Sequence, residues 1–411
     1  MRIQLAVLVF GLVTGAMANT VLFTVLGPVA RDIGLTELQV GAMISAAGLT
    51  FVFSGALWGR LSDRIGRKRV FVIGVAAYAG CGAGFAWLLG LGLAGTLTGA
   101  AAFWALLAFR AGVYATLAGG PQPAAAAWVA DTTSGAERTG GMALVGASFA
   151  IGSILGPAAG GLLAPFGVLV PLYAIAVLGA LAALLAAIVV REPRSHAERR
   201  AGSGARLSPL DSRIRLLLTT SVLTFITIGS TQQVAAFYVQ DLTGADAAQT
   251  MRLVSIAMVA MAVGILISQG GIVQLLKPEP RTLFCWGLPL AAAGFVVLVL
   301  SGAVWQVVVG YAAMGLGYGL TNPAVSAAVS LAVDERVQGA AAGLVSASYA
   351  AGFIVGPLLG TALYQIDPRL TFGASALLAA LALVTALRAT AARTRSASAQ
   401  RNQYTPDSEQ P

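Results

Sequence analysis

The sequence predicts an all-α integral membrane protein in which twelve membrane-spanning helices form two similar six-helix bundles. Composition is the first reason: 57% of the 411 residues are hydrophobic and 10% are charged, whereas an ordinary soluble domain carries about 25% charged residues. The second reason is a series of apolar runs of roughly 20 residues, the length that crosses a bilayer. The third is a glycine–proline pattern that occurs twice, at 152–161 and at 352–361.

The apolar runs are expected to be helices, because an isolated spanning segment must satisfy its own backbone hydrogen bonds. The expected spans are 4–28, 37–58, 70–90, 102–130, 141–164, 167–190, 216–239, 251–275, 282–301, 304–333, 339–364 and 369–390. The chain begins like a signal peptide, with Arg2 before an apolar stretch and small residues at 16–18. Because the apolar run continues beyond residue 18, we expect it to remain as the first membrane helix.

Basic residues set the orientation, because loops rich in Arg and Lys stay in the cytoplasm. If the N-terminus is cytoplasmic, the outer loops hold only Arg31, Arg252 and Arg369, and Arg110 lies within a span. The remaining 21 of the 25 basic residues then lie on the cytoplasmic side or at helix ends that face it. We therefore expect a multi-pass membrane protein with both termini in the cytoplasm. Loop orientation explains the net charge of +9 without a nucleic-acid partner.

A polar, basic stretch divides the chain into two sets of six spans. The expected division is an N-terminal bundle at 1–190, a cytoplasmic linker at 191–215, a C-terminal bundle at 216–392 and a disordered cytoplasmic tail at 393–411. The tail is assigned by its low hydrophobicity and its many polar residues.

The repeated glycine–proline pattern belongs to a longer repeat. Residues 141–163 and 341–363 are identical at eleven of 23 positions. Glycines four residues apart lie on one helix face and let a neighbouring helix approach closely in lipid, and a proline favours a bend. The predicted hinge residues are Gly152, Gly156, Pro157, Gly160, Gly352, Gly356, Pro357 and Gly360. Tight packing without hinge motion is the alternative interpretation.

Repeated six-helix halves indicate a transporter, because such halves can rock about a central site near the membrane midplane. The loop between the second and third spans, GRLSDRIGRKR at 59–69, contains five basic residues and one acid, Asp63. Topology needs only the positive charges, so the acid indicates an ion pair or a helix-terminus contact. The alternative is a solvated loop charge.

This loop resembles the G-x-L-x-D-R-x-G-R-K signature of the major facilitator superfamily. Three further features resemble the superfamily's 12-helix drug:proton antiporter branch: the arginine in FRAGVYATLAGG, Asp131 at the inner end of that span, and GSILGPAAGG in the fifth span. The resemblance covers essentially the whole chain and implies the major facilitator fold. It also implies that the protein works as a monomer, and the family's distribution, with the arginine bias at the inner side, implies a bacterial inner membrane.

The resemblance assigns a conformational latch to Gly59, Asp63, Arg64, Gly66, Arg67 and Asp131. It implies that Asp63 contacts the start of the eleventh span and that Arg67 pairs with Asp131, which together would hold the outward-open state. Many relatives in this branch also carry a carboxylate in the first span for proton exchange. This chain departs from them, because its first span offers only Asn19 and Thr20 as a polar pair.

Arg110 is the charge that lies deep within a span, and no acid occupies the middle third of any span. A central charge costs about 2.5–3.5 kcal/mol on insertion, so Arg110 is expected to face protein or water. One interpretation is a cavity cation that binds substrate or responds to protonation elsewhere, and the other is a structural clamp. A positive cavity would favour neutral, zwitterionic or carboxylate-bearing molecules over lipophilic cations.

Other polar and aromatic side chains within the apolar runs are candidates for substrate binding or coupling beside Arg110. They are Asn19, Gln122, Gln232, Gln233, Asn322, Tyr238 and Tyr318. Gln122 and Asn322 stand at nearly equivalent positions of the repeat, which supports both. Any single aromatic among them is also compatible with packing or with contact to lipid.

Together these observations predict a secondary active transporter that exports a small polar or carboxylate-bearing molecule by alternating access, coupled to protons. Proton-coupled uptake of a small organic solute is the alternative, and a membrane-embedded enzyme, sensor or scaffold is a third class. The sequence shows no nucleophile–base or metal cluster and no phosphate-binding loop. We therefore expect no enzyme, no cofactor and no metal; the expected partners are the substrate, protons and the lipid bilayer.

Overall fold

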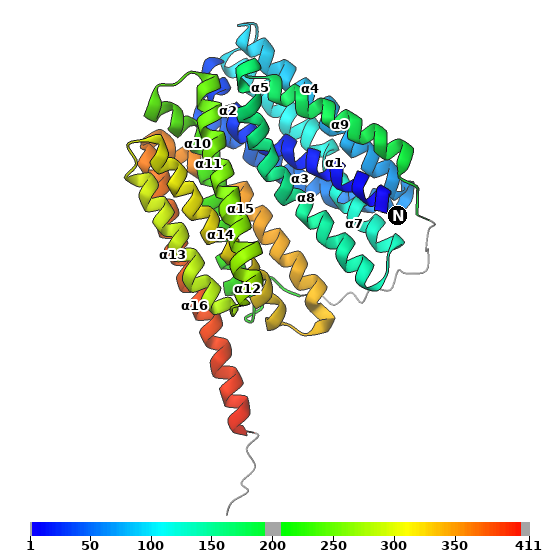
Figure 1. Ribbon diagram of the computed structural model, residues 1–411, viewed down its shortest axis with the longest axis vertical. Coiled ribbons are helices and arrows are strands. Elements are labelled where there is room, and N and C mark those ends of the chain that lie inside the picture. Colours follow the sequence, from blue (N-terminus) through cyan, green and yellow to red (C-terminus); the bar gives the residue numbers. More distant parts are fainter. Residues whose placement is uncertain (1, 194–206, 404–411) are drawn as a thin grey trace, which may run out of the picture.

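The computed structural model describes residues 2–193 and 207–403, and these residues form helices and connecting turns without a strand (Figure 1). The helices of the first half are α1 (Arg2–Thr20), α2 (Leu22–Asp32), α3 (Glu37–Ile65), α4 (Arg67–Leu93), α5 (Gly99–Leu107), η1 (Ala108–Tyr114), α6 (Ala115–Leu117), α7 (Pro121–Thr132), α8 (Gly135–Leu163), η2 (Ala164–Phe166) and α9 (Val170–Val189). Those of the second half are α10 (Arg215–Thr243), α11 (Ala247–Leu266), η3 (Ile267–Val273), α12 (Gln274–Leu276), α13 (Pro280–Val299), α14 (Val304–Ala332), η4 (Glu335–Val337), α15 (Gln338–Ile366) and α16 (Pro368–Gln403).

The predicted membrane spans correspond to these helices. Within the described residues, eleven helical stretches are long and apolar enough to cross a membrane. The twelfth predicted span, 304–333, is helix α14, which has 29 residues and packs against α11 and α13. Four glycines between 310 and 319, with Thr321 and Asn322, lower its mean hydropathy below that of the other spans. The twelve-helix membrane fold is confirmed.

The spans are not all regular α-helices. The first is interrupted at Val21 between α1 and α2. The fourth and the eighth each contain a seven-residue π-helical segment, η1 and η3. Such wide turns inside α-helices are rare, and they often occur at functional sites. In the fourth span the π-helical segment includes Arg110.

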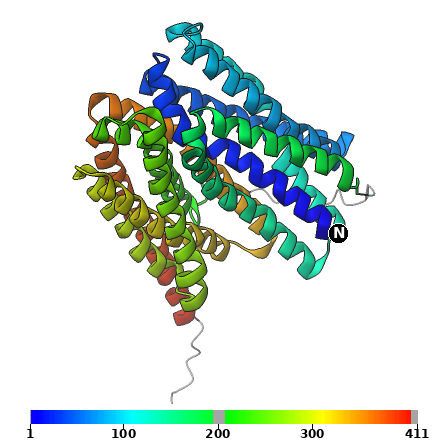
Figure 2. The same ribbon diagram turned by 45° about the horizontal axis from the view of Figure 1, so that its top comes forward.

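The helices form an N-terminal bundle (α1–α9) and a C-terminal bundle (α10–α16), which meet near one end and diverge towards the other (Figures 1 and 2). We call the meeting end, with Arg31 and the connections at 95–99 and 301–303, the Arg31 end. The opposite end, with Gly66 and the connection between α9 and α10, is the linker end. Gly27 next to Ala236 and Gly161 next to Ser255 join the two bundles on the Arg31 side. The predicted domain boundaries remain a prediction.

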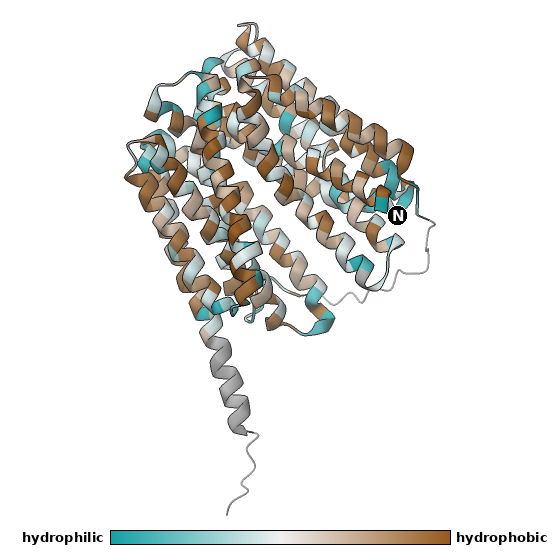
Figure 3. Cartoon of the chain, in the orientation of Figure 1, coloured by the Kyte–Doolittle hydropathy of each residue, from teal (hydrophilic) through white to brown (hydrophobic). Residues whose placement is uncertain are grey.

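Hydropathy follows this arrangement. Hydrophobic residues cover most of the length of the helices, and hydrophilic ones gather at the helix ends and in the connections (Figure 3). Because charged and polar groups are costly in hydrocarbon, the two ends mark the two membrane surfaces. The N-terminus lies at the linker end, and α16 extends beyond the bundle on the same side. The assignment of that side to the cytoplasm remains a prediction from the basic residues.

The repeated glycines form two matching seams inside the bundles. Gly152 and Gly156 of α8 lie against α1, where an added Cβ would meet the Val13 and Met17 carbonyl oxygens at 2.7 and 2.8 Å. Gly356 of α15 lies against α10 in the same way, and its added Cβ would meet the Ile226 carbonyl oxygen at 2.7 Å. These glycines therefore permit the close backbone approach that the spacing predicts. The other three, Gly160, Gly352 and Gly360, lie against Thr24, Phe225 and Ser230 respectively.

Both prolines of the repeat lie where the bundles meet. The Ser255 hydroxyl of α11 donates a hydrogen bond of 2.6 Å to the Pro157 carbonyl oxygen of α8. On the other side, Gly41 of α3 lies against the Pro357 carbonyl oxygen and Thr361 of α15. Helices α8 and α15 therefore each contact their own bundle through the repeated glycines and the opposite bundle beside Pro157 or Pro357. The hinge role of these residues stays a prediction.

The structure describes only part of the predicted linker and part of the predicted tail. Residues 194–206 of the predicted linker and 404–411 of the predicted tail lie outside the described residues. In the structure α16 continues as a helix to Gln403, which includes 393–403 of the predicted tail; the boundaries of the tail stay a prediction. This stretch, RTRSASAQRNQ, contains no proline or glycine and includes strong helix formers, so a helix already formed in the membrane can propagate through it.

We expect Gly356→Ala to destabilise the protein by about 1–3 kcal/mol, because the added methyl group overlaps α10 backbone atoms that cannot move away cheaply. Thermal unfolding of the purified protein in detergent measures this change. Gly343→Ala on the same helix is the matched control, because an added Cβ there meets nothing within 4 Å. Equal melting temperatures for the two variants would contradict the seam.

Candidate functional site

Arg110 lies on the π-helical segment η1 of the fourth span and faces the interior of the N-terminal bundle. Its side chain is 7% exposed. The Nη2 group donates a hydrogen bond of 2.8 Å to the Asn19 side-chain oxygen on α1. The guanidinium also lies over the ring of Tyr114, 4.5 Å from its centroid, which is a favourable cation–π geometry. The structure therefore brings together two residues that the sequence predicts for one site.

The hydrogen bonding of Arg110 is incomplete. Its buried Nε group has no hydrogen-bond partner within the described part of the chain. The cavity next to it, lined by Arg110, Tyr78, Tyr114 and Phe85 among others, has a volume of about 20 Å³, which holds about one water molecule. An organic substrate does not fit there in this conformation. A buried cation with a free donor can bind a small acceptor such as a carboxylate group or a water.

The other predicted polar residues lie on different helices. Gln122 is exposed on α7, Asn322 is half-buried on α14, and Gln232 on α10 lies 4.0 Å from the Met261 sulfur. Gln233 of α10 is 3% exposed, and its side-chain oxygen has no partner among the described residues. No hydrogen bond given by the structure links these four residues with Arg110. Their role in substrate binding stays a prediction.

The two predicted tyrosines stabilise the C-terminal bundle. The Tyr238 hydroxyl group lies 2.7 Å from the Ser301 hydroxyl oxygen, and its ring packs edge-on against Phe372. The Tyr318 hydroxyl lies 2.7 Å from the Thr227 hydroxyl oxygen. Both side chains are buried with satisfied hydroxyl groups, so this conformation favours the packing interpretation for both.

At the linker end, the charged loop 59–69 is held by ion pairs within the N-terminal bundle. Arg67 lies 2.5 Å from Asp63 and 3.1 Å from Asp131. The pairing of Arg67 with Asp131 is as the resemblance implies. Among the described residues, the ion pair given for Asp63 is with Arg67 and not with α15. Gly66 has φ +103°, a conformation that favours glycine. Gly59 and Arg64 belong to the last two turns of α3.

Sequence reasoning missed Glu192, which closes this loop. Its carboxylate accepts hydrogen bonds from the backbone N–H groups of Arg67 and Lys68, at 2.5 and 3.1 Å. These N–H groups belong to the first turn of α4, where a negative charge is stabilised. The only sequence signal is an acid directly after the sixth span.

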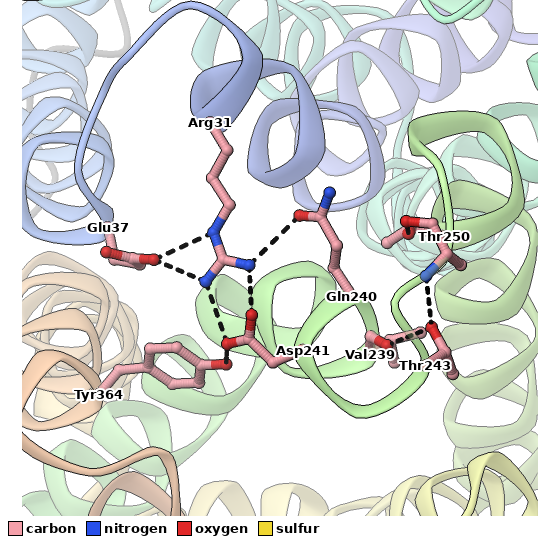
Figure 4. Close-up of polar contacts among 9 residues, drawn as sticks. Arg31, Glu37, Val239, Gln240, Asp241, Thr243, Thr250 and Tyr364 are labelled. Atoms are coloured by element: carbon pink, nitrogen blue, oxygen red, sulfur yellow. Dashed lines mark hydrogen bonds and ion pairs between the residues drawn. The ribbon is translucent and has the colours of Figure 1, made fainter.

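A second missed cluster lies at the Arg31 end (Figure 4). The Arg31 guanidinium binds Glu37 Oε1 at 2.7 Å, Asp241 Oδ1 at 2.5 Å and Asp241 Oδ2 at 3.0 Å. Its Nη1 group also lies 3.4 Å from the Gln240 side-chain oxygen. The Tyr364 hydroxyl donates a hydrogen bond of 2.6 Å to Asp241. In the sequence, Arg31 stands out only as a basic residue of an outer loop.

Comparison with known proteins agrees with this arrangement. A family model described as Major Facilitator Superfamily matches residues 8–274 and 230–408. The chain is 29% identical to the class G tetracycline resistance protein of Vibrio anguillarum, over 74% of this chain and 75% of that protein. It is 24% identical to the quinolone resistance protein NorA of Staphylococcus aureus strain MRSA252, over 79% and 81%. Multidrug resistance protein 2 of Bacillus subtilis is 27% identical, but the match spans only 38% of that protein.

Solved structures share the fold at low sequence identity. A bacterial homologue of the human lysosomal transporter Spinster, in an inward-facing and unoccupied conformation, has a TM-score of 0.73 and 15% identity over 94% of this chain and 96% of that one. The nucleoside transporter NupG has a TM-score of 0.70 and 16% identity over 95% and 99%. At this identity, the likeness supports the fold alone.

The Arg110–Asn19 contact generates a stability prediction. Asn19→Leu removes the acceptor of a buried cation, so we expect a loss of about 1.5–3 kcal/mol. Asn19→Asp keeps an acceptor and adds an opposite charge, and we expect it to unfold at a temperature no lower than the wild type. Thermal unfolding in detergent measures both variants, with Asn322→Leu on α14 as the control. A wild-type melting temperature for Asn19→Leu would show that the contact contributes nothing.

Proposed function

The chain belongs to the major facilitator superfamily and is a membrane transporter, not an enzyme, and on this basis we propose that it exports a small polar or carboxylate-bearing molecule. Export would proceed by alternating access of a site between the two bundles. Metabolites, siderophores and drugs that carry a carboxylate belong to this substrate class.

The buried Arg110 carries the proposal for substrate class. It has one side-chain acceptor, Asn19, and a free Nε group, and the middle third of every predicted span is without an acid. A desolvated cation without a carboxylate partner attracts anionic groups strongly and repels cations. A carboxylate that reaches it could form charge-assisted, bidentate hydrogen bonds. A lipophilic cation would gain nothing there and would lose hydration.

The direction and the coupling rest on the relatives. The names of the curated relatives describe resistance to tetracyclines, quinolones and multiple drugs, which supports export from a bacterial inner membrane. We propose coupling to protons in a monomeric protein. Because the first span offers Asn19 in place of a carboxylate, the proton would travel through Asp63 and Asp131 or on the substrate itself. Uptake remains the alternative direction for the same fold.

We further propose that the charged loop is the latch that holds the outward-open state. In the present conformation, Asp63, Arg67 and Asp131 are bound to each other within one bundle. Closure of the linker end would bring the start of α15 towards Asp63. The Arg67–Asp131 pair would then hold the loop in position, and the proline-containing helices α8 and α15 would accommodate the motion.

The substrate-class proposal predicts that Arg110→Ala strongly reduces export of a carboxylate-bearing probe such as norfloxacin. Loss of a hydrogen bond to a charged group corresponds to roughly a 10- to 100-fold weaker interaction. Uptake of the probe into everted membrane vesicles, driven by an imposed proton gradient, measures the activity. Arg252→Gln, an exposed charge far from Arg110, is the control and should transport normally. Strong ethidium transport that survives Arg110→Ala would overturn the proposed substrate class, and probe movement only in the opposite direction would favour uptake.

The latch predicts a modest rate effect for Asp131→Asn. The partly exposed pair with Arg67 is worth about 0.2–1 kcal/mol, so we expect counterflow in proteoliposomes to slow by roughly 1.5- to 5-fold with little change in apparent affinity. Asp211→Asn is the matched control, because Asp211 pairs with Arg213 outside the predicted latch. An unchanged rate in Asp131→Asn, or an equal loss in the control, would argue against the latch.

A further inference from the structure

The cluster of Arg31, Glu37, Asp241 and Tyr364 joins the two bundles through charged groups. Arg31 ends the first span on α2, and Glu37 begins α3 in the same bundle. Asp241 and Tyr364 belong to α10 and α15 of the C-terminal bundle. The two hydrogen bonds between Arg31 and Asp241 therefore cross from one bundle to the other. The Arg31 guanidinium also lies 5.1 Å from the ring centroid of Phe237 on α10.

Both charges of the crossing pair, Arg31 and Asp241, have a second partner inside their own bundle. Arg31 keeps Glu37, which it binds through both Nε and Nη2. Asp241 keeps the Tyr364 hydroxyl group. Separation of the bundles would therefore break the crossing bonds without leaving a bare charge on either side. This matters because an ion left without a partner after separation would oppose the motion.

Solvent can reach the cluster. The Arg31, Glu37 and Asp241 side chains are 26%, 19% and 42% exposed. A partly exposed ion pair loses less when water replaces its partner than a fully buried one does. The contact is thus strong enough in its two-point geometry to favour closure, yet weak enough to be reversible.

The opposite end of the molecule shows the complementary arrangement. There, the ion pairs of Arg67 with Asp63 and Asp131 all lie within the N-terminal bundle, and the bundles diverge (Figure 1). At the Arg31 end the ion pair crosses, and the bundles meet. In this conformation, the ion pair at the Arg31 end therefore links the two bundles, whereas the Arg67 ion pairs at the linker end do not.

We propose that Arg31 and Asp241 form a reversible latch that keeps the Arg31 end closed, with Glu37 and Tyr364 as the partners that hold the two charges after release. When the Arg31 end opens, the crossing bonds break. Arg31 then stays with Glu37, and Asp241 stays with Tyr364. The latch acts on the conformational equilibrium and not on any particular substrate, so it does not depend on the proposed cargo.

Distances between spin labels test the latch in the full-length protein in lipid nanodiscs. The background carries Cys81→Ala and Cys285→Ser, and the labels are attached at Ala94→Cys and Gln365→Cys, on opposite bundles at the Arg31 end. We expect Arg31→Gln and Asp241→Asn each to raise the ratio of the long-distance to the short-distance population by roughly 2- to 30-fold, because the two-point contact is worth about twice an ordinary partly exposed ion pair. The double variant should raise it no further than a single one, because both changes remove the same interaction.

Two controls distinguish a latch from general loosening. Arg252→Gln removes an exposed charge at the same end on α11 and should leave the ratio unchanged. Glu37→Gln should lower the ratio, because Arg31 then lacks its partner after release. A merely destabilising substitution would change the ratio in the opposite sense.

Salt provides a second test of the latch. Raising ionic strength from about 0.1 to 1 M shortens the Debye length from about 10 to 3 Å, so the wild-type ratio should rise while that of Asp241→Asn stays constant. Additive effects of the two single variants, an unchanged ratio in both, or a wild-type ratio that does not respond to salt would each overturn the proposal.

Discussion

Close approach of helix backbones is the constraint on which the rest of this structure depends. Between helices in lipid there is little hydrophobic driving force, so packing must come from van der Waals contact at short range. Glycines on α8 and α15 provide that contact with α1 and α10, and at Gly356 even one methyl group would overlap the opposite backbone. Because the same two helices contact the other bundle beside Pro157 and Pro357, packing within a bundle and contact between bundles are coupled.

Most of the ion pairs lie at the two ends of the molecule, outside the closely packed glycine seams. At both ends these pairs have partial access to water, where pairing is cheap and reversible. Arg110 is the exception, because it lies inside a bundle with Asn19 and Tyr114 as neighbours. The irregular π-helical segment around it belongs to the same local arrangement. Under the proposals made above, polar groups at the two ends govern which end opens, and Arg110 governs what is bound.

Sequence patterns located part of the candidate site and missed part of it. Arg110 and Asn19 were identifiable because a charge or an amide in an apolar run is conspicuous. Arg67 and Asp131 were paired only through the family resemblance. Arg31, Asp241 and Tyr364 carry no such mark, because each stands at a helix end where polar residues are ordinary. Their partners are also up to 210 residues apart in the chain, so no local pattern links them.

The sequence alone determined the fold class, the approximate spans and the internal repeat. Bilayer thickness sets the length of each apolar run, and helix periodicity sets the spacing of the glycines, so both can be recognised in short stretches of sequence. It did not determine which end of the molecule is closed or which charges cross between the bundles. The continuation of α16 to Gln403 was equally beyond it. Those features depend on how two preformed bundles are placed against each other, and that placement is decided by contacts between distant residues in the folded protein.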